Sequence, residues 1–311
     1  MTELGGTVDR PESARRGDAP IATAGRSRDL DVLLDILDLT EVDENTYVGR
    51  HPAEVGSRTF GGQLVAQALV AAGRTVSGAR PIHAINAHFI RGGDVKRDIT
   101  FRVERHRDGR AFANRQVTAY QGDEELFVML AAYQDSRGGL EHSVEWPEVE
   151  YPESLPPLGN HFDGYEDRLK MFVDALKPID MRYANDPAWI MKGTGERSNH
   201  NRVWMKSDGP LPDDPALHVA TMGYASDTTV LDSIITTHGL SWGFDRIVAA
   251  TVNHSIWFHR PFRFDEWMLY ATESPVAAGS RGLATGRFFS RGGELVATVV
   301  QEGLIRHFPA R

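Results

Sequence analysis

Two segments of the chain are apolar on almost every side and are predicted to be buried helices. The first covers residues 64–76, which are mostly Leu, Val and Ala. The second is expected within residues 222–235, a short loop that runs into a helix. Its apolar residues recur with a period near 3.6: Val230, Leu231, Ile234 and Ile235. Asp227 stands where this helix is predicted to begin, and a lone Asp at such a position is most often only a helix cap.

Four runs of strand-like sequence follow the first helix. They cover residues 83–90, 99–105, 111–121 and 126–134. Hairpin turns are indicated between the later runs by Asp108-Gly109 and Gly122-Asp123. One buried helix followed by antiparallel strands predicts a sheet that wraps around that helix.

The second half of the chain repeats the first at a fixed offset of 169 residues. Without a gap, the offset aligns Phe89 with Phe258, Arg91 with Arg260, Phe101 with Tyr270, Glu104 with Glu273, Glu125 with Glu294 and Leu126 with Leu295. It also places the first buried helix over the one expected to begin near Thr228. The chain is therefore predicted to be a duplication. Two such units can pair their sheets edge to edge, with the helices inside and fewer sheet edges exposed.

The repeat divides the chain into four parts. Residues 1–28 lack periodicity and are predicted to be a disordered tail. Residues 29–140 form the first unit and residues 179–311 the second. Between them, residues 141–178 are predicted to be an extended, Pro-rich linker with a connecting helix. That helix is indicated by Tyr165, Leu169, Phe172 and Leu176.

Composition excludes several classes of protein. The net charge of −9 argues against nucleic-acid binding, which usually needs a basic face. The absence of Cys excludes disulfides and thiolate chemistry, and no His-Glu-x-x-His pattern occurs, so no metal site is expected. No apolar run is long enough for a signal peptide or a membrane span. We therefore expect a cytoplasmic protein without membrane insertion.

The repeat also shows where the two copies differ in polarity. At the offset of 169, Asp227 falls on Arg58, Thr251 on Ile82 and Gln301 on Ala132. Polar groups that face a central helix are costly unless they bond one another, a water or a ligand. Two interpretations follow. Either the three side chains form a satisfied polar cluster that fixes helix to sheet, or they orient one water for attack on a carbonyl. The second needs a carboxyl whose pKa lies above the usual ~3.9, or one that mainly orients the water.

Four motifs in order give the chain a family resemblance. They are Arg-Thr-Phe-Gly-Gly-Gln at 58–63, Gly-Tyr-Ala-Ser-Asp at 223–227, His-Ser-Ile-Trp-Phe-His-Arg-Pro-Phe at 254–262 and Val-Gln-Glu-Gly-Leu-Ile-Arg at 300–306. Together they resemble the acyl-CoA thioesterase II family over about residues 30–307. The resemblance implies an α+β double hotdog fold: two antiparallel sheets, each wrapped around a buried helix and joined into one.

The resemblance also implies an activity and its residues. The activity is hydrolysis of acyl-CoA to fatty acid and CoA without metal or organic cofactor, and we expect medium- to long-chain substrates. The family's Asp, Thr/Ser and Gln correspond to Asp227, Thr251 and Gln301. One departure is Asn253, where the family usually has Asp before the His-Ser-x-Trp-Phe-His run. By analogy with other hotdog proteins, a dimer or tetramer of chains is expected.

Other residues are candidates for substrate binding. Phe60, Met222 and Trp257 are proposed to line the acyl chain, although each is more often plain core. Gly61 and Gly62 are also substrate-binding candidates, and the pair indicates close backbone packing. Backbone N–H groups near a helix start, not identified by the sequence, are expected to polarise the thioester oxygen. Four arginines are candidates for the CoA phosphates: Arg58, Arg91, Arg260 and Arg281.

Two alternative functions stay open from the sequence. A hydratase or dehydratase acting on acyl-CoA would need an Asp/His acid–base pair. His238 lies eleven residues after Asp227 in the sequence, too far along a helix to serve. A CoA or lipid sensor could keep the fold without the chemistry. A Ser nucleophile is disfavoured because no Gly-x-Ser-x-Gly motif occurs.

Overall fold

The computed structural model describes residues 25–52, 58–78 and 80–309. Most of the predicted disordered tail lies outside these ranges. At its end, Ser27 caps helix α1 (Arg28–Leu37) by accepting a hydrogen bond from the backbone N–H of Leu30 at 3.2 Å. None of the helices in the described ranges is long and apolar enough to cross a membrane.

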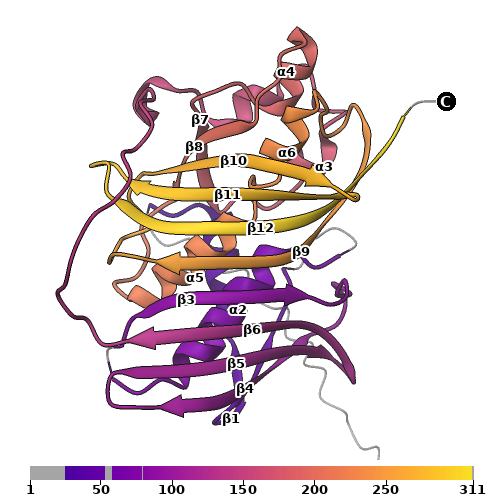
Figure 1. Ribbon diagram of the computed structural model, residues 1–311. Helices are drawn as coiled ribbons and strands as arrows, with labels where there is room; N and C mark the ends of the chain where they lie inside the picture. The colour runs from indigo at the N-terminus through magenta and orange to yellow at the C-terminus, as the bar shows by residue number, and fades with distance from the viewer. Residues whose placement is uncertain (1–24, 53–57, 79, 310–311) are drawn as a thin grey trace, which may run out of the picture.

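Both halves of the chain fold as a helix against antiparallel strands (Figure 1). After α1, the first half contains β1 (Thr40–Asp43), β2 (Thr46–Gly49), α2 (Gly61–Arg74), β3 (Ile82–Phe89), β4 (Ile99–Asp108), β5 (Phe112–Gln121) and β6 (Glu124–Gln134). The second half contains β7 (Ile179–Tyr183), α4 (Ala188–Thr194), β8 (His200–Ser207), α5 (Pro215–Ser226), α6 (Asp232–Thr237), β9 (Arg246–Phe258), β10 (Met268–Ala278), β11 (Arg281–Ser290) and β12 (Leu295–Phe308).

The strands form one antiparallel sheet of twelve, in the order β1-β2-β4-β5-β6-β3-β9-β12-β11-β10-β8-β7. The two halves join where β3 pairs with β9. At this seam Asn86 pairs with Ser255, its own equivalent at the offset of 169, and the Asn86 side chain donates a hydrogen bond to the Ser255 hydroxyl at 2.9 Å. The sheet curves around α2 and α5, which pack against each other inside it (Figure 1). This arrangement confirms the predicted edge-to-edge duplication.

The offset of 169 holds for three of the four repeated strands but not for the last. It relates the first residues of β4 and β10, Ile99 and Met268, and the last residues of β3 and β9. In the first half Ile85 pairs with Ala131, whereas in the second half His254 pairs with Gln301. Gln301 therefore occupies the place of Ala131, not Ala132. The β11–β12 turn is longer than the β5–β6 turn, which shifts the register by one residue.

The predicted second helix is wrong in position. The central helix of the second half is α5, which begins after the N-cap Asp214 with Pro215 in its first turn and has Asp227 as its C-cap. Asp227 therefore ends a helix and does not begin one. Its counterpart in the first half is Thr75, the C-cap of α2, and not Arg58. These two caps lie 152 residues apart, so the second half has 17 extra residues between its helix and its strand.

The extra residues explain the misleading apolar pattern. They include α6, whose Ile234 packs on Gly282, and the preceding Leu231, which packs on Gly303. Residues 230, 234 and 235 are buried as the pattern predicts. However, Ile234 and Ile235 belong to the six-residue helix α6, which packs against β10, β8 and β11, and none of the three residues is part of the central helix of the unit.

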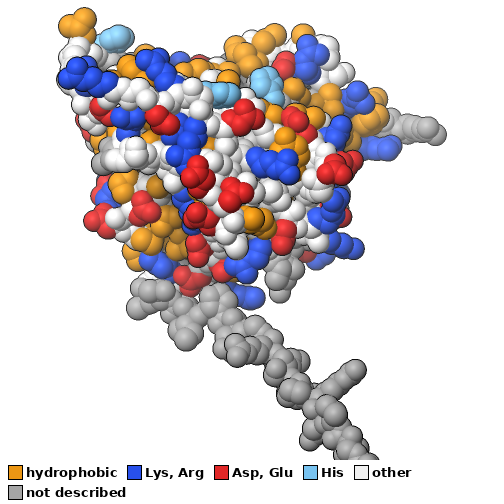
Figure 2. Space-filling view, turned by 90° about the horizontal axis from the view of Figure 1, so that it is seen from below, with side chains coloured by type: hydrophobic (Ala, Val, Ile, Leu, Met, Phe, Trp, Pro, Cys, Tyr) orange, Lys and Arg blue, Asp and Glu red, His pale blue; other side chains and the backbone are white. Residues whose placement is uncertain are grey.

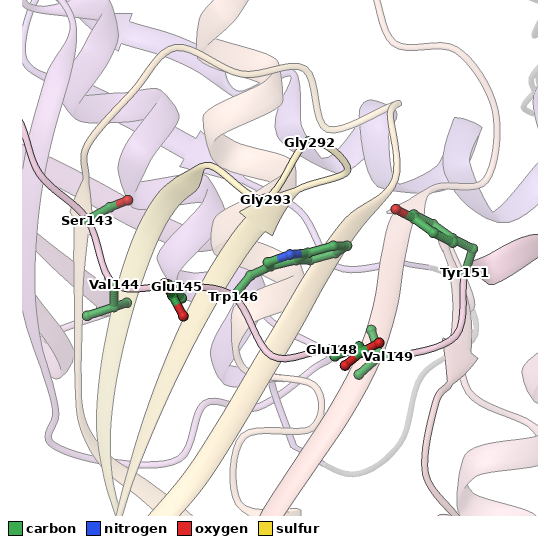
Figure 3. Close-up of a pocket in the computed structure, with 9 residues that line it drawn as sticks. All are labelled: Ser143, Val144, Glu145, Trp146, Glu148, Val149, Tyr151, Gly292 and Gly293. Carbon is green, nitrogen blue, oxygen red and sulfur yellow. The ribbon is translucent and has the colours of Figure 1, made fainter.

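The linker has no helix or strand over residues 141–151, and its helix is short. It contains two 3₁₀ turns, η1 (Pro152–Ser154) and η2 (Leu158–Phe162), and only four residues of α-helix in α3 (Lys170–Val173). Residues 143–155, here called the strap, cross the outer face of the sheet. There Trp146 packs against a cluster of four buried sheet residues: Trp204, Leu269, Ala271 and Phe289. A groove between the strap and the β11–β12 turn lies on this outer face (Figure 3).

Charged side chains of both signs are interspersed over the end of the molecule seen in Figure 2. No extended basic surface appears in that view, as the net charge of −9 suggests. Among the residues that the structure describes, no cluster of three or more His, Asp or Glu side chains is placed to hold a metal ion.

Candidate active site

Asp227 lies where the end of α5 meets the beginning of α2. A Cβ atom added to Gly61 would be 2.6 Å from Oδ2 of Asp227. One added to Gly62 would overlap the carbonyl oxygen of Tyr224. The two glycines therefore let the helix ends approach, and they bring the positive end of the α2 dipole to the carboxylate. This close approach is the role that the sequence suggested for the glycine pair.

Two strands bring Thr251 and Gln301 to the same carboxylate. The Thr251 hydroxyl, on β9, donates a hydrogen bond to Asp227 Oδ1 at 3.0 Å. The Gln301 amide nitrogen Nε2, on β12, donates to the same oxygen at 2.8 Å and to Thr251 Oγ1 at 3.0 Å. Gln301 is fully buried, whereas Asp227 and Thr251 keep part of their surface exposed. The three side chains thus form one cluster that is open on the Asp227 and Thr251 side.

The surroundings make Asp227 a stronger base than a free aspartate. Burial raises the pKa of its carboxyl. A positive charge on His254 would oppose that shift, as do the hydrogen bonds from Gln301, Thr251 and the Gly62 backbone. The upward direction brings the carboxyl closer to the range in which a general base works near neutral pH.

His254 lies behind the cluster and was not among the predicted site residues. Its Nδ1 is hydrogen-bonded to Gln301 Oε1, and its Nε2 lies 2.9 Å from the Ser226 hydroxyl. Burial lowers the pKa of the His254 ring. The repeat contained a usable signal, because His254 replaces the apolar Ile85 of the first half. That is the same criterion that singled out Thr251.

The corresponding place in the first half is filled. Arg115, fully buried on β5, donates to the hydroxyl and carbonyl oxygens of Thr75 at 2.8 and 2.9 Å and to Asp108 at 2.6 Å. At the offset of 169 the second half has the small Ala284 instead of this arginine. The arginine that is bonded to the helix end of the first half therefore has no counterpart at this position in the second half.

The other predicted residues separate into two groups. Phe60 precedes α2 and packs edge to face on Tyr224, with ring centroids 5.0 Å apart. Met222 is buried on α5, just over one turn before Asp227. Both lie on the elements that carry the site. Arg58 is exposed, with its side chain beside Gly92.

Trp257 and Arg260 do not belong with that group. Trp257 is 38% exposed, and its neighbours Ile256 and Phe258 point into the core. Because side chains alternate along a strand, Trp257 faces the outer side of the sheet and cannot line a chain held beside the helices. Arg260 pairs with Glu141 of the linker at 3.2 Å. The prediction that Trp257 lines the acyl chain is therefore wrong.

Asn253 also lies on the outer face of β9. Its side-chain nitrogen donates to the Glu302 carboxylate at 3.3 Å, and its oxygen accepts from the Glu302 backbone N–H at 3.4 Å. Arg281 donates to the same carboxylate at 2.8 Å. An amide suits this position because a second carboxylate beside Glu302 would add like-charge repulsion. The substitution thus acts away from Asp227.

Comparisons with known proteins agree with this architecture. Residues 172–304 match the family described as acyl-CoA thioesterase, and residues 50–134 match the acyl-CoA thioesterase N-terminal domain. Acyl-coenzyme A thioesterase 8 of Rattus norvegicus is 35% identical over 287 residues, which cover 88% of each chain.

Two solved structures extend the comparison. An acyl-CoA thioesterase II from Mycobacterium marinum is 36% identical, with a TM-score of 0.73 over 90% of this chain and 98% of that one. A protein from Alicyclobacillus acidocaldarius, described as having a hot dog fold, has a TM-score of 0.73 at 18% identity, over 89% of this chain and 98% of its own. The second likeness shows the fold alone, and it confirms the predicted double hotdog.

Proposed function

Since the chain belongs to the acyl-CoA thioesterase II family and is a thioester hydrolase, we propose that it cleaves medium- to long-chain acyl-CoA by direct attack of one water. Asp227 is the general base in this proposal, and Thr251 and Gln301 hold the water in the geometry for attack. The observation that carries it is the convergence of both side chains on a single carboxylate oxygen, Asp227 Oδ1.

The hydrogen bonds inside the cluster determine how a water would be held. The Thr251 hydroxyl proton is used on Asp227, and Gln301 Nε2 directs its two protons to Asp227 and Thr251. The cluster therefore presents only acceptor lone pairs on its open side. A water bound there donates its hydrogens to the cluster and turns an oxygen lone pair away from it. That lone pair is the nucleophile.

The reaction then proceeds in two steps. The water oxygen bonds to the thioester carbon while Asp227 takes one proton, and the carbonyl oxygen becomes negatively charged. The N-terminal turn of α2, at Gly61 and Gly62, is proposed to stabilise that charge with its backbone N–H groups and dipole. Collapse of this intermediate breaks the carbon–sulfur bond. The proton on Asp227 passes to the leaving thiolate, which gives free fatty acid and CoA.

The substrate's acyl chain is proposed to lie beside the helices, along Phe60 and Met222. Of the four arginines, Arg58 and Arg91 remain candidates for the CoA phosphates, because Arg260 and Arg281 already pair with Glu141 and Glu302 on the outer face. Association into a dimer or tetramer also remains a proposal, which light scattering of the purified chain would test.

The hydratase alternative is disfavoured by the position of the one histidine near Asp227. Both ring nitrogens of His254 are occupied, by Gln301 and Ser226, and the ring is fully buried. It is not offered to a substrate as an acid or base. The sensor alternative predicts binding without release of free thiol.

A thiol-release assay with acyl-CoAs from short to long chain tests the proposal. Asp227→Asn and Thr251→Val are expected to lower kcat at least about 100-fold, and Thr251→Ser to retain most activity because it keeps the hydroxyl. Wild-type turnover in Asp227→Asn would refute the assigned base.

Isotope labelling separates the covalent routes from direct attack. In heavy-oxygen water, direct attack labels the fatty acid in the first turnover. An acyl anhydride on Asp227 that water opens at the aspartyl carbon would release unlabelled acid first and leave the heavy oxygen in Asp227. Opening at the acyl carbon labels the acid as direct attack does, so that route is tested by mass spectrometry for an acylated Asp227 in quenched enzyme. Mass spectrometry of quenched enzyme detects an acylated Thr251, which would also overturn the proposal.

A further inference from the structure

His254 occupies a fully enclosed position between the active cluster and the end of α5. It comes from β9, while its two partners come from β12 and α5. Neither His254 nor Gln301 has any exposed surface, so solvent cannot replace either partner from outside. Among the described residues, the imidazole is the only group that bonds to the side-chain amide oxygen of Gln301, Oε1.

The bonds through His254 form a closed circuit. Asp227 accepts from Gln301, Gln301 bonds to His254, and His254 bonds to Ser226. Ser226 is joined to Asp227 by the peptide bond, so the path returns to its start. The circuit is anchored on its far side by Tyr270, whose hydroxyl donates to the Ser226 carbonyl oxygen at 2.9 Å.

The circuit matters because a glutamine side chain must be held at both ends of its amide. Asp227 and Thr251 hold the nitrogen end by accepting its two protons. The oxygen end would be a buried acceptor without a partner if His254 were apolar, which costs free energy. The side chain would then shift or rotate to relieve that cost. Either movement would displace the two N–H groups of Gln301 Nε2, which hold Asp227 and Thr251 in place at the water site.

We propose that His254 is a positioning residue that holds the Gln301 amide in the orientation required for water attack, with Ser226 fixing the proton on its ring. The inference rests on the function proposed for Asp227, Thr251 and Gln301. His254 touches neither water nor substrate in this scheme. It acts by donating from Nδ1 to the amide oxygen.

The orientation of Gln301 requires the tautomer that makes this possible, because its nitrogen end donates to Asp227 and Thr251 and its oxygen end therefore faces Nδ1 as an acceptor. Ser226 supports this tautomer in the proposal. Its hydroxyl donates to the Gly223 carbonyl oxygen at 2.9 Å and lies equally close to His254 Nε2, to which its one proton can turn. When it donates to Nε2, that nitrogen carries the lone pair and the ring proton sits on Nδ1. The Nδ1–H group then faces Gln301 Oε1, an acceptor.

Two substitutions at the same position separate donation from packing. His254→Asn places an amide N–H near the Nδ1 position, and it is expected to keep kcat within about threefold of wild type. His254→Leu fills the space without a donor, and it should lower kcat about 10-fold or more with KM changed by less than about threefold. Ser226→Ala, a smaller change, should lower kcat by a few-fold, because the tautomer is no longer imposed.

A matched control uses a histidine–glutamine pair on the surface. His106 lies 3.4 Å from Gln116 in an exposed contact between β4 and β5. His106→Leu is expected to leave kcat and KM unchanged.

Nitrogen-15 NMR of the full chain supplies a second readout. The ring resonances of His254 are identified as those missing from the His254→Asn spectrum. In wild type they should show a protonated Nδ1 and an unprotonated Nε2. A protonated Nε2 with an unprotonated Nδ1 would overturn the proposal.

The results distinguish this inference from the function on which it rests. If Gln301→Ala and Asp227→Asn lose activity while folded His254→Leu and Ser226→Ala match wild type, the positioning role is refuted alone. If Asp227→Asn and Gln301→Ala keep full turnover, the proposed function itself fails. If His254→Leu does not fold, Ser226→Ala and the ring tautomer still decide the question.

Discussion

The amide nitrogen of Gln301 lies 2.8 Å from Oδ1 of Asp227, although 74 residues separate them in the chain. The contact joins the end of α5, the central helix of the second half, to β12, which lies next to the seam strand β9. Through this contact a helix cap becomes part of an active cluster.

The glycine at the start of α2 is expected to be required for activity. In Gly61→Ala the new Cβ would stand 2.6 Å from Asp227 Oδ2, so the carboxylate or the helix end must move. We expect kcat to fall about 10-fold or more in the thiol-release assay. Gly73→Ala, in the same helix with open space around it, is the control. It should retain kcat and gain about 0.5–1 kcal/mol in stability.

The acid limb of the pH–rate profile should reflect the raised pKa of Asp227. The carboxylate must be ionised to act as base, so kcat/KM rises with pH as it loses its proton. Because burial raises that pKa, the limb should lie above the ~4 typical of aspartate. Thr251→Val removes a hydrogen bond to the ionised form and should move the limb to higher pH. A limb that stays near pH ~4 in both proteins would contradict this assignment.

A second buried carboxyl, Asp232, should make stability depend on pH. Burial raises its pKa to about 6, although it accepts a hydrogen bond from Trp242 Nε1 at 2.8 Å. In the unfolded chain the Asp232 carboxyl has a pKa of ~3.9, so it ionises at a lower pH there than in the folded protein. Stability is therefore lost as pH rises from about 4 to about 6, by roughly 3 kcal/mol.

Asp232→Asn removes this titration and tests the sign. Chemical denaturation should show the variant gaining on wild type between pH ~4 and ~6, with a constant difference above that range. Trp242→Phe, which deletes a donor to the ionised form, should move the wild-type dependence to higher pH. Parallel stability curves for wild type and Asp232→Asn would show that the carboxyl is not perturbed.

Arg115 is expected to serve stability and not catalysis. Its guanidinium is buried and bonded to Thr75 and Asp108 beside the end of α2. Arg115→Ala should lower the free energy of unfolding by about 2–4 kcal/mol and leave the kcat of folded enzyme unchanged. Arg105→Ala removes an exposed ion pair on the neighbouring strand and should cost less than about 1 kcal/mol. A large fall in kcat in folded Arg115→Ala would show that the first half contributes to the reaction.

Much of the fold was determined by the sequence alone. Alternating side chains and hairpin glycines are local signals, and they placed the strands of the first half. The repeat at 169 residues predicted the duplicated sheet, and Asn86 meets Ser255 at the seam as that repeat implies. Replacement of apolar residues by polar ones in the second copy singled out Thr251 and Gln301. An error of one residue in the alignment did not matter for Gln301, because both Ala131 and Ala132 are apolar.

Only the tertiary structure decided where these residues meet. The apolar run around Ile234 could not show whether it was the central helix or a short helix over β10 and β11, because both must be buried. The alternation of side chains along a strand did not by itself show which face of the sheet Trp257 occupies. The position of Asp227 at the end of α5, against Gly61 and in front of His254, results from closing two halves into one sheet. Local patterns set which faces are apolar, but the approach of two helix ends is set by the packing between elements distant in sequence.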